Sequence, residues 1–168
     1  MSPLDDSTAF FVEAVDPAAA GARVVPFEPW HMGRLRGREH ETQAWAAIGG
    51  IERTAELCDQ SDYAYSVLVA GLPVACIGVT PLWRGVGAAW AFLGTDAQRY
   101  WKTIHSGVKM FLRGALCDGE FHRIQTAVRL DHAAAHRWAL RLGFSPEGVL
   151  HGYGYDRADF MAYARCSR

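Results

Sequence analysis

His132 and His136 stand four residues apart, a spacing that would bring both imidazoles to one side of a helix. Among the seven histidines, this is the pair that could share a ligand such as a metal ion. Zinc sites of that kind add a third ligand or the glutamate of an HExxH motif, and the sequence shows neither beside this pair. We therefore expect no metal ion here.

The four cysteines, Cys58, Cys76, Cys117 and Cys166, are far apart and form no CxxC pair. Zinc clusters and redox motifs both depend on closely spaced cysteines. We expect reduced thiols, most of them buried, and no metal cofactor.

The charges of the chain are balanced, with 17 Lys and Arg against 18 Asp and Glu and a formal net charge of -1. Such a balance produces no overall field that would draw the protein onto nucleic acid or an anionic membrane. A nucleic-acid partner is therefore not indicated by charge. A nucleic-acid-binding function would need a basic face that the composition does not reveal.

The longest apolar runs, residues 67–70 and 74–79, are interrupted by Gly and Pro well short of the ~20 residues of a membrane span. The first six residues carry acids and no basic region ahead of an apolar core, so they do not resemble a secretion signal. We expect no membrane association and residence in the cytoplasm.

A chain of 168 residues, half of them apolar, fits one domain with a single core. We expect residues 1–168 to form that domain, with residues 1–22 as a loosely ordered arm. The elements expected in its first half are a strand over 23–27, a short helix from Pro29 to near Gly37, a helical stretch over 39–58 divided at Gly49-Gly50, and a meander of strands over 65–70, 74–81 and 88–93.

The second half begins with the clearest pattern. Residues 96–117 carry apolar side chains at the three-four spacing of an amphipathic helix. A strand over 122–128 follows, and then a helix capped by Asp131 and ended by Gly143. Residues 144–150 and 159–164 complete the chain as a hairpin. This order predicts a mixed sheet, in the α/β (mixed α+β) class.

The order of elements, together with Leu142-Gly143-Phe144 and Glu147-Gly148-Val149, resembles the GNAT family of N-acetyltransferases. The stretch 90–101, the long helix rich in Lys and Arg, and the final hairpin look like GNAT-related proteins of tailed bacteriophages. The resemblance covers roughly residues 67–163. It implies a three-layer fold with a mixed, mostly antiparallel sheet of about six to seven strands between helices, and acetyl-coenzyme A as co-substrate. The alternative is another mixed α/β fold in which Gly-Phe only ends a helix and starts a strand.

In that family, a bulge splays the fourth strand from its parallel neighbour and frees backbone N–H groups for the thioester. The resemblance places these groups at Phe92, Leu93 and Gly94, and it places the pyrophosphate at a helix start over 97–103. The cofactor-binding residues that it implies are Phe92, Leu93, Gly94, Arg99, Tyr100, Lys102, Thr103 and His132.

Two departures from the family pattern bear on catalysis. The pyrophosphate turn lacks the usual glycines, since none occurs until Gly107. Arg99 and Lys102 could assist the pyrophosphate there, or they could be solvent-facing charges. The second departure is Ala139, where many relatives carry the Tyr that protonates the leaving thiolate. The acid would then be another residue, water, or nothing.

The acid–base candidates are Asp96, His105 and His132. His132 stands where many relatives place a cofactor-contacting Asn, so it could face the pantetheine, act on a proton, or be a polar residue in a first helical turn. Asp96 and His105 are the nearest titratable groups for taking a proton from the amine.

The acceptor side of such a fold is built from the first helices and the last hairpin. The candidate substrate-binding residues are His31, Glu41, Tyr153 and Tyr155. Tyr153 and Tyr155 could line the mouth of a pocket or simply be strand residues. The mixture of charges in both regions defines no substrate.

Two functions remain open. The first is favoured, but the sequence does not decide whether the chain is an enzyme. It is an acetyl-coenzyme A-dependent N-acetyltransferase acting on a primary amine of a protein, a small molecule or a modified base. The second is a catalytically silent GNAT-like binding or virion-associated phage protein, in the host cytoplasm if phage-encoded. The intact order of elements favours cofactor binding, whereas the missing glycines and Ala139 favour the silent module. A homodimer is left open.

Overall fold

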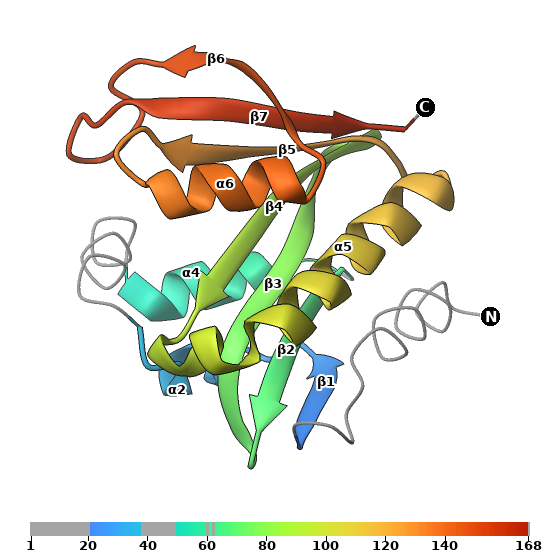
Figure 1. The fold of residues 1–168 in the computed structure, drawn as a ribbon, viewed down its shortest axis with the longest axis vertical. Coiled ribbons are helices and arrows are strands. Elements are labelled where there is room, and N and C mark those ends of the chain that lie inside the picture. The colour runs from blue at the N-terminus through green and yellow to red at the C-terminus, as the bar shows by residue number, and fades with distance from the viewer. Residues whose placement is uncertain (1–20, 38–49, 60, 62, 168) are drawn as a thin grey trace.

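A computed structural model describes residues 21–37, 50–59, 61 and 63–167. Most of the arm expected over 1–22, and Glu41 with the first part of the stretch 39–58, lie outside the described residues. The strands are β1 (Ala22–Pro26), β2 (Ala64–Val69), β3 (Leu72–Trp83), β4 (Gly85–Leu93), β5 (Phe121–Arg129), β6 (Ser145–Leu150) and β7 (Phe160–Cys166). The helices are α2 (Pro29–Arg34), α4 (Gly50–Asp59), α5 (Trp101–Cys117), α6 (Ala133–Arg141) and the 3₁₀ helix η1 (Thr95–Tyr100) (Figure 1).

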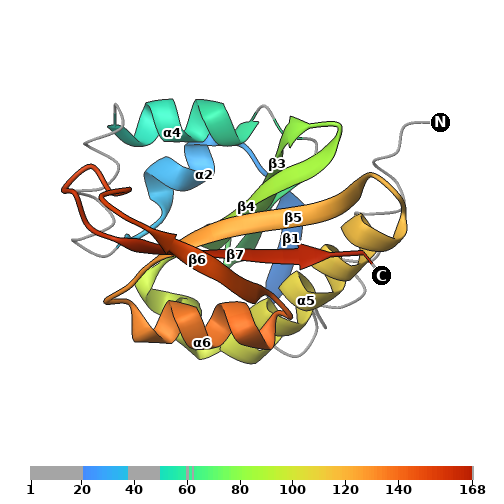
Figure 2. The same cartoon turned by 90° about the horizontal axis from the view of Figure 1, so that it is seen from above.

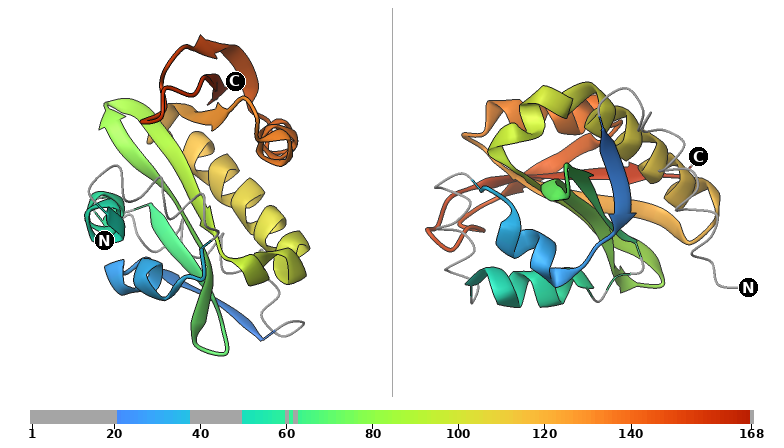
Figure 3. Two further views of the ribbon diagram at one scale, coloured as in Figure 1. Left: turned by 90° about the vertical axis from the view of Figure 1, so that its left-hand side faces the viewer. Right: turned by 90° about the horizontal axis from the view of Figure 1, so that it is seen from below.

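The strands form one sheet in the order β1-β2-β3-β4-β5-β7-β6. Only β4 and β5 pair in parallel, and all other neighbours are antiparallel. Helices α5 and α6 cover one face, and α2 and α4 cover the other (Figures 2 and 3). The predicted three-layer fold with a mixed, mostly antiparallel sheet is confirmed.

The parallel pair β4–β5 is short. Its register joins residues 85–88 of β4 to residues 121–125 of β5, with an irregularity between Gly85 and Val86. Beyond Ala88 the two strands diverge, as Figure 1 shows. Residues 89–93 of β4 therefore keep β3 as a neighbour and have, among the described strands, an open edge on the β5 side.

Two apolar cores flank the sheet. The larger lies under α5, whose buried residues are Ile104, Gly107, Val108, Phe111, Leu112, Ala115 and Leu116, at the spacing expected from the sequence. The smaller lies under α2 and α4 and includes Phe27, Met32, Ala55, Cys58 and Cys76. Cys117 and Cys166 are exposed, so the expectation of mostly buried thiols holds for only two of the four. None of the described helices combines the length and apolar character that a membrane span requires.

Two helix starts differ from the predictions. The long helix was expected from Asp96, but residues 95–100 form a 3₁₀ helix and α5 begins at Trp101, where the apolar periodicity also begins. Neither Gly94 nor Tyr100 supplies a side-chain cap that could start an α-helix earlier. The N-cap of α6 is His132 rather than Asp131, because Arg129 holds the Asp131 carboxylate through two nitrogens at 3.0 Å.

The end of α6 matches its prediction. Gly143 adopts a φ of 86°, a left-handed conformation that favours glycine after a helix. The Phe144 N–H donates to the Ala139 carbonyl at 3.1 Å, and Nη1 of Arg165 donates to the Leu142 carbonyl at 2.9 Å. The carbonyls of Ala139 and Leu142 at this end are thus hydrogen-bonded, and Phe144 is buried in the larger core.

Candidate functional site

The open edge of β4 is the feature around which a site can be built. Gly94 donates its N–H to the Val74 carbonyl of β3 at 2.9 Å. Because an antiparallel ladder alternates, the N–H of Phe92 also points toward β3, whereas those of Ala91 and Leu93 point toward the open side. We expected free N–H donors at Phe92, Leu93 and Gly94. The structure corrects this expectation, because the N–H groups on the open side belong to Leu93 and Ala91.

The pyrophosphate turn is also built differently from the expectation. The helical N-terminus is at Thr95, so the backbone of residues 97–103 lies inside helical turns. The Thr95 N–H donates to the Arg36 carbonyl and the Ala97 N–H to the Gly94 carbonyl. Asp96 stands in the first helical turn, where its negative charge opposes a bound anion.

The side chains of this turn divide into two groups. Arg99 and Lys102 are exposed and could meet a phosphate group as cations. Tyr100 is half-buried and packs against the larger core, and Thr103 is also half-buried. Anion binding at this turn would thus rest on two side-chain charges.

His105 is placed in a bridge between two helices. Nε1 of Trp138 on α6 donates to Nδ1 of His105 on α5 at 3.2 Å. The ring of Trp101 stacks on His105 with centroids 6.4 Å apart and contacts Trp138 with centroids 5.0 Å apart. Burial lowers the pKa of His105, and the charges of Lys109 and Arg141 lower it further.

This hydrogen bond decides what His105 can do. A neutral imidazole has one lone pair on a ring nitrogen, and here Nδ1 uses it to accept from Trp138. Nε2 then carries the proton and has no lone pair to offer. In this arrangement, the expected role of His105 as a general base is not supported, and the residue joins α5 to α6 instead.

The two histidines at helical spacing have separate partners. His132 accepts the Ala135 N–H at Nδ1 (3.3 Å) and so caps α6. His136 places Nδ1 2.9 Å from the Tyr163 hydroxyl and Nε2 3.3 Å from the Leu130 carbonyl. The capping bond occupies the Nδ1 lone pair of His132, so only Nε2 could face a cofactor. Within the described part of the chain, no three His, Cys, Asp or Glu gather in a way that could hold a metal ion.

Position 139 provides no hydroxyl and no space for one. Ala139 is 5% exposed and belongs to the core that also holds Leu142, Phe144 and Tyr163. The nearby Tyr163 hydroxyl is directed to His136. Among the acid–base candidates, this leaves Nε2 of His132 and Asp96, which is exposed and follows Leu93 by three residues.

The candidate acceptor-binding residues differ in exposure, since His31 is buried and the two tyrosines are on the surface. His31 is 1% exposed, and its Nδ1 accepts the Glu28 N–H at 2.9 Å as part of the cap of α2. Burial lowers its pKa, partly offset by the Glu28 charge. His31 therefore lies in the fold and not on a substrate-facing surface, which corrects the expectation. Tyr153 and Tyr155 are 62% and 55% exposed in the β6–β7 connection.

The β6–β7 connection is held by its own hydrogen bonds. Asp159 accepts the Gly152 N–H at 2.8 Å and lies 2.9 Å from Nδ1 of His151. Arg129 at the end of β5 reaches Asp156 at 2.7 Å while it also holds Asp131. The two tyrosines are thus carried by a segment fixed to the start of α6.

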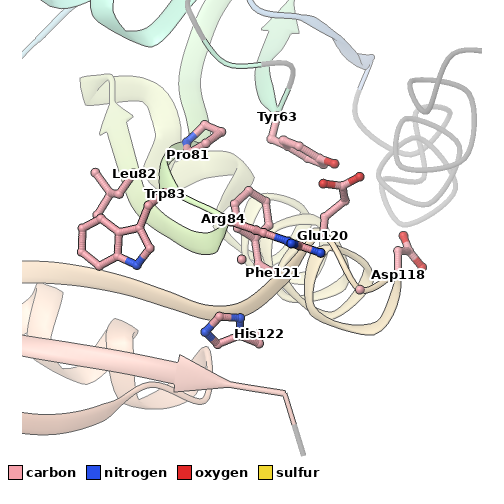
Figure 4. A pocket seen from close by; sticks show the side chains of 11 residues that line it. Tyr63, Pro81, Leu82, Trp83, Arg84, Asp118, Glu120, Phe121 and His122 are labelled. Atoms are coloured by element: carbon pink, nitrogen blue, oxygen red, sulfur yellow. The ribbon is translucent and has the colours of Figure 1, made fainter.

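A hollow of about 720 Å³ lies at the other end of β4. Tyr63 and residues 81–85 and 118–122 line it, between the β3–β4 turn and the end of α5 (Figure 4). The open edge of β4 begins after Ala88, away from this hollow. The hollow is therefore separate from the candidate site.

Sequence reasoning missed two of these features. The contact between His105 and Trp138 joins residues 33 positions apart, and no local pattern announces it. The second feature is the pair of salt bridges from Arg129 to Asp131 and Asp156, here called the Arg129 clamp. The sequence offers a hint of the first, since Arg129 and Asp131 are two residues apart. The second partner, Asp156, is 27 positions away.

No protein-family model matches the sequence, and no curated protein matches it either. Solved structures do match in fold. Ard1 from Thermoplasma volcanium has a TM-score of 0.70 at 16% identity, covering 88% of this chain and 98% of its own. A GNAT-family acetyltransferase from Bacillus anthracis has a TM-score of 0.65 at 12% identity, covering 87% and 95%.

A third structure is that of RimL, a ribosomal L7/L12 α-N-protein acetyltransferase in complex with coenzyme A. Its TM-score is 0.62 at 15% identity, and the match covers 86% of this chain and 93% of RimL. At such identities the similarity concerns the path of the chain and not its chemistry. The chain has the fold of the GNAT acetyltransferases.

Proposed function

We propose that this protein is an acetyl-coenzyme A-dependent N-acetyltransferase acting on a primary amine. The observation that carries the proposal is the open edge of β4 beyond Ala88, toward which the N–H of Leu93 points. A solved structure of the same fold holds coenzyme A, which supports the choice of co-substrate.

The residues at this edge fit acetyl-coenzyme A in part. Leu93 offers a backbone donor for a carbonyl oxygen, and Arg99 and Lys102 offer exposed cations for a pyrophosphate. Asp96 opposes an anion at the same helical turn. Binding would therefore depend on the two cations more than on backbone amides.

In the transfer, the amine nitrogen attacks the carbonyl carbon, the C–S bond breaks, and coenzyme A leaves as a thiolate. The Leu93 N–H would stabilise the carbonyl oxygen as it gains charge. Asp96 would take the proton from the amine. Because position 139 has no hydroxyl, the thiolate would leave unassisted and take its proton from water.

For the acceptor, we favour the α-amino group of a protein N-terminus. RimL, which shares the fold, is an α-N-protein acetyltransferase. The exposed Tyr153 and Tyr155 offer rings on which an extended peptide could pack. Glu41, outside the described residues, remains a further proposed contact.

Two observations favour the alternative of a silent binding module. The pyrophosphate turn has no glycine, and Ala139 stands in a closed core where many members of the family carry a Tyr. Such a module, a binding or virion-associated phage protein, would transfer no acetyl group.

Thermal unfolding with and without acetyl-coenzyme A tests co-substrate binding. A ligand at about a hundred times its dissociation constant stabilises the folded state by about 2.7 kcal/mol. The absence of stabilisation at millimolar acetyl-coenzyme A would exclude the enzyme. Release of free thiol with a peptide that has a free N-terminus, but not with the same peptide N-acetylated, would then separate the enzyme from the silent module.

A further inference from the structure

Helices α5 and α6 carry five of the 17 basic residues of the chain and none of the 18 acidic ones. The five are Lys102, Lys109, Arg113, Arg137 and Arg141, all exposed. Both helices lie on the same face of the sheet (Figures 1 and 2). The balanced net charge thus conceals an asymmetry, since these two helices carry basic residues and no acidic ones.

The positions within each helix gather these charges. Lys109 and Arg113 are four residues apart on α5, and Arg137 and Arg141 are four apart on α6, so each pair shares one side of its helix. Lys102 precedes Lys109 by seven residues and lies on the same side of α5. These three cations form a row of roughly 16 Å at the rise of 1.5 Å per residue.

The rows on the two helices lie close together. His105 of α5 is bonded to Trp138 of α6, and its pKa is lowered by burial and then by both Lys109 and Arg141. Burial lowers the pKa of Arg165 on β7. Cys117 raises this pKa in part, and the charge of Arg113 lowers it further. Three elements therefore bring cations to one region.

No carboxylate neutralises these cations in the part of the chain that the structure describes. The ion pairs there involve Arg53, Arg123, Arg129 and His151. Like charges four residues apart on a helix repel one another. A face whose cations have no carboxylate partner among the described residues suits a ligand that carries several negative charges.

We propose that the α5–α6 basic face, formed by Lys109, Arg113, Arg137, Arg141 and Arg165, binds the phosphate backbone of a nucleic acid. Cations on three neighbouring elements can contact several phosphates, and the guanidinium group matches phosphate oxygens in a bidentate manner. Four of the five groups are guanidinium groups. Cations of this kind contact phosphate oxygens and not base edges, so the binding does not depend on base sequence.

This face is distinct from the proposed coenzyme turn. Arg99 and Lys102 lie at the start of α5, whereas Lys109 and Arg113 lie about two and three turns further along the helix. The inference therefore does not rest on the proposed acetyltransferase activity. Saturating acetyl-coenzyme A should leave nucleic-acid binding unchanged.

Fluorescence anisotropy with a labelled single-stranded RNA of about 20 nucleotides tests the proposal, with single-stranded DNA of the same length as a second arm. The test variant is Lys109→Gln/Arg113→Gln/Arg141→Gln. The matched control is Arg23→Gln/Arg53→Gln/Arg84→Gln, which removes three exposed charges from other elements. Circular dichroism melting checks that both variants fold, and Arg113→Gln/Arg137→Gln serves if the triple variant does not.

We expect the test variant to bind RNA at least tenfold more weakly at about 100 mM salt. The magnitude of the slope of log K against log salt should fall by about 2, because three phosphate contacts are lost. The control should stay within about twofold of the parent. RNA and DNA should bind alike, because the contact is to phosphate.

Three outcomes would overturn the proposal. One is no RNA binding by the parent up to about 100 μM protein, the weak end of ordinary non-specific affinities. A second is an equal loss in both variants. The third is binding of poly-glutamate or anionic vesicles more tightly than RNA, which would assign the face to an acidic protein or to a lipid surface.

Discussion

Trp138 of α6 donates its indole N–H to Nδ1 of His105 on α5, across 3.2 Å. The bond fixes the neutral tautomer of the imidazole with its proton on Nε2. It also ties α5 and α6, which cover one face of the sheet, to each other, and Trp101 packs against both rings. His105, which the sequence analysis named as a candidate base, therefore helps to hold α5 and α6 together.

This relationship predicts a pH-dependent stability. Burial and the charges of Lys109 and Arg141 lower the pKa of folded His105, so the unfolded state binds a proton first as the pH falls below about 6.5. The stability that His105 contributes is present above that pH and is lost as the pH falls toward the folded pKa. Urea unfolding at pH 7.5 and 5.5 should show a smaller loss for His105→Gln than for the parent.

The exposed His122 supplies the control for this measurement. His122→Gln removes an imidazole outside the α5–α6 contact and leaves the hydrogen bond between His105 and Trp138 in place. His31, whose pKa is also lowered by burial, will leave part of the pH dependence in the His105 variant. Equal losses in the parent and in His105→Gln would contradict the assignment.

The closed core at position 139 predicts that the family's Tyr cannot simply be restored. Ala139 is 5% exposed among Leu142, Phe144 and Tyr163, and a phenol ring there would overpack the core. Ala139→Tyr should lower the free energy of unfolding by about 1–3 kcal/mol in denaturant titrations. Ala134→Tyr, at an exposed position of the same helix, should change it by less than about 0.5 kcal/mol. A stable Ala139→Tyr with higher transferase activity would instead mean that the site has room for the acid.

The turn after β4 predicts opposite effects of two neighbouring changes on acetyl-coenzyme A binding. Arg99→Ala/Lys102→Ala removes both exposed cations and should weaken binding about tenfold or more. Asp96→Asn removes a negative charge from the helical start and should tighten binding roughly two- to fivefold. Isothermal titration calorimetry measures both, with Arg23→Ala/Arg53→Ala as the control.

Asp96 has a second effect in the same variant if it takes the proton from the amine. Asp96→Asn should then lower kcat while it lowers the dissociation constant for the co-substrate. Unchanged kcat would exclude Asp96 as the base. Unchanged affinity in the Arg99/Lys102 variant would place the pyrophosphate elsewhere.

Most of the fold was predictable because its signals are local. The three-four spacing of residues such as Ile104, Val108 and Phe111 marks α5, and Gly143 marks the end of α6. The divergence of β4 from β5 was expected only from the family resemblance. No local signal in residues 85–93 tells where a parallel partner will leave.

The candidate site was less predictable because its side chains are placed by distant partners. Asp131 has the residue type and position of an N-cap, yet Arg129 holds it and His132 takes that role. His31 follows a Glu28 cap by three residues, a local spacing that could have predicted its burial in the α2 turn. The basic α5–α6 face was hidden because a net charge sums over all surfaces.

The Arg129 clamp predicts how the proposed acceptor loop is positioned. Arg129 joins Asp131, ahead of α6, to Asp156 in the β6–β7 connection, and both carboxylates keep a lowered pKa through these bonds. Arg129→Gln should release the connection that carries Tyr153 and Tyr155, while the sheet stays intact. Hydrogen exchange should then speed up at the amides of residues 152–158 and stay unchanged in β5. Arg123→Gln, which breaks the other bidentate pair with Glu147, is the matched control and should leave residues 152–158 unaffected.

If the loop positions the acceptor, Arg129→Gln should raise KM for a peptide amine without changing the affinity for acetyl-coenzyme A. A parallel loss of co-substrate binding would show instead that the clamp supports the whole cleft.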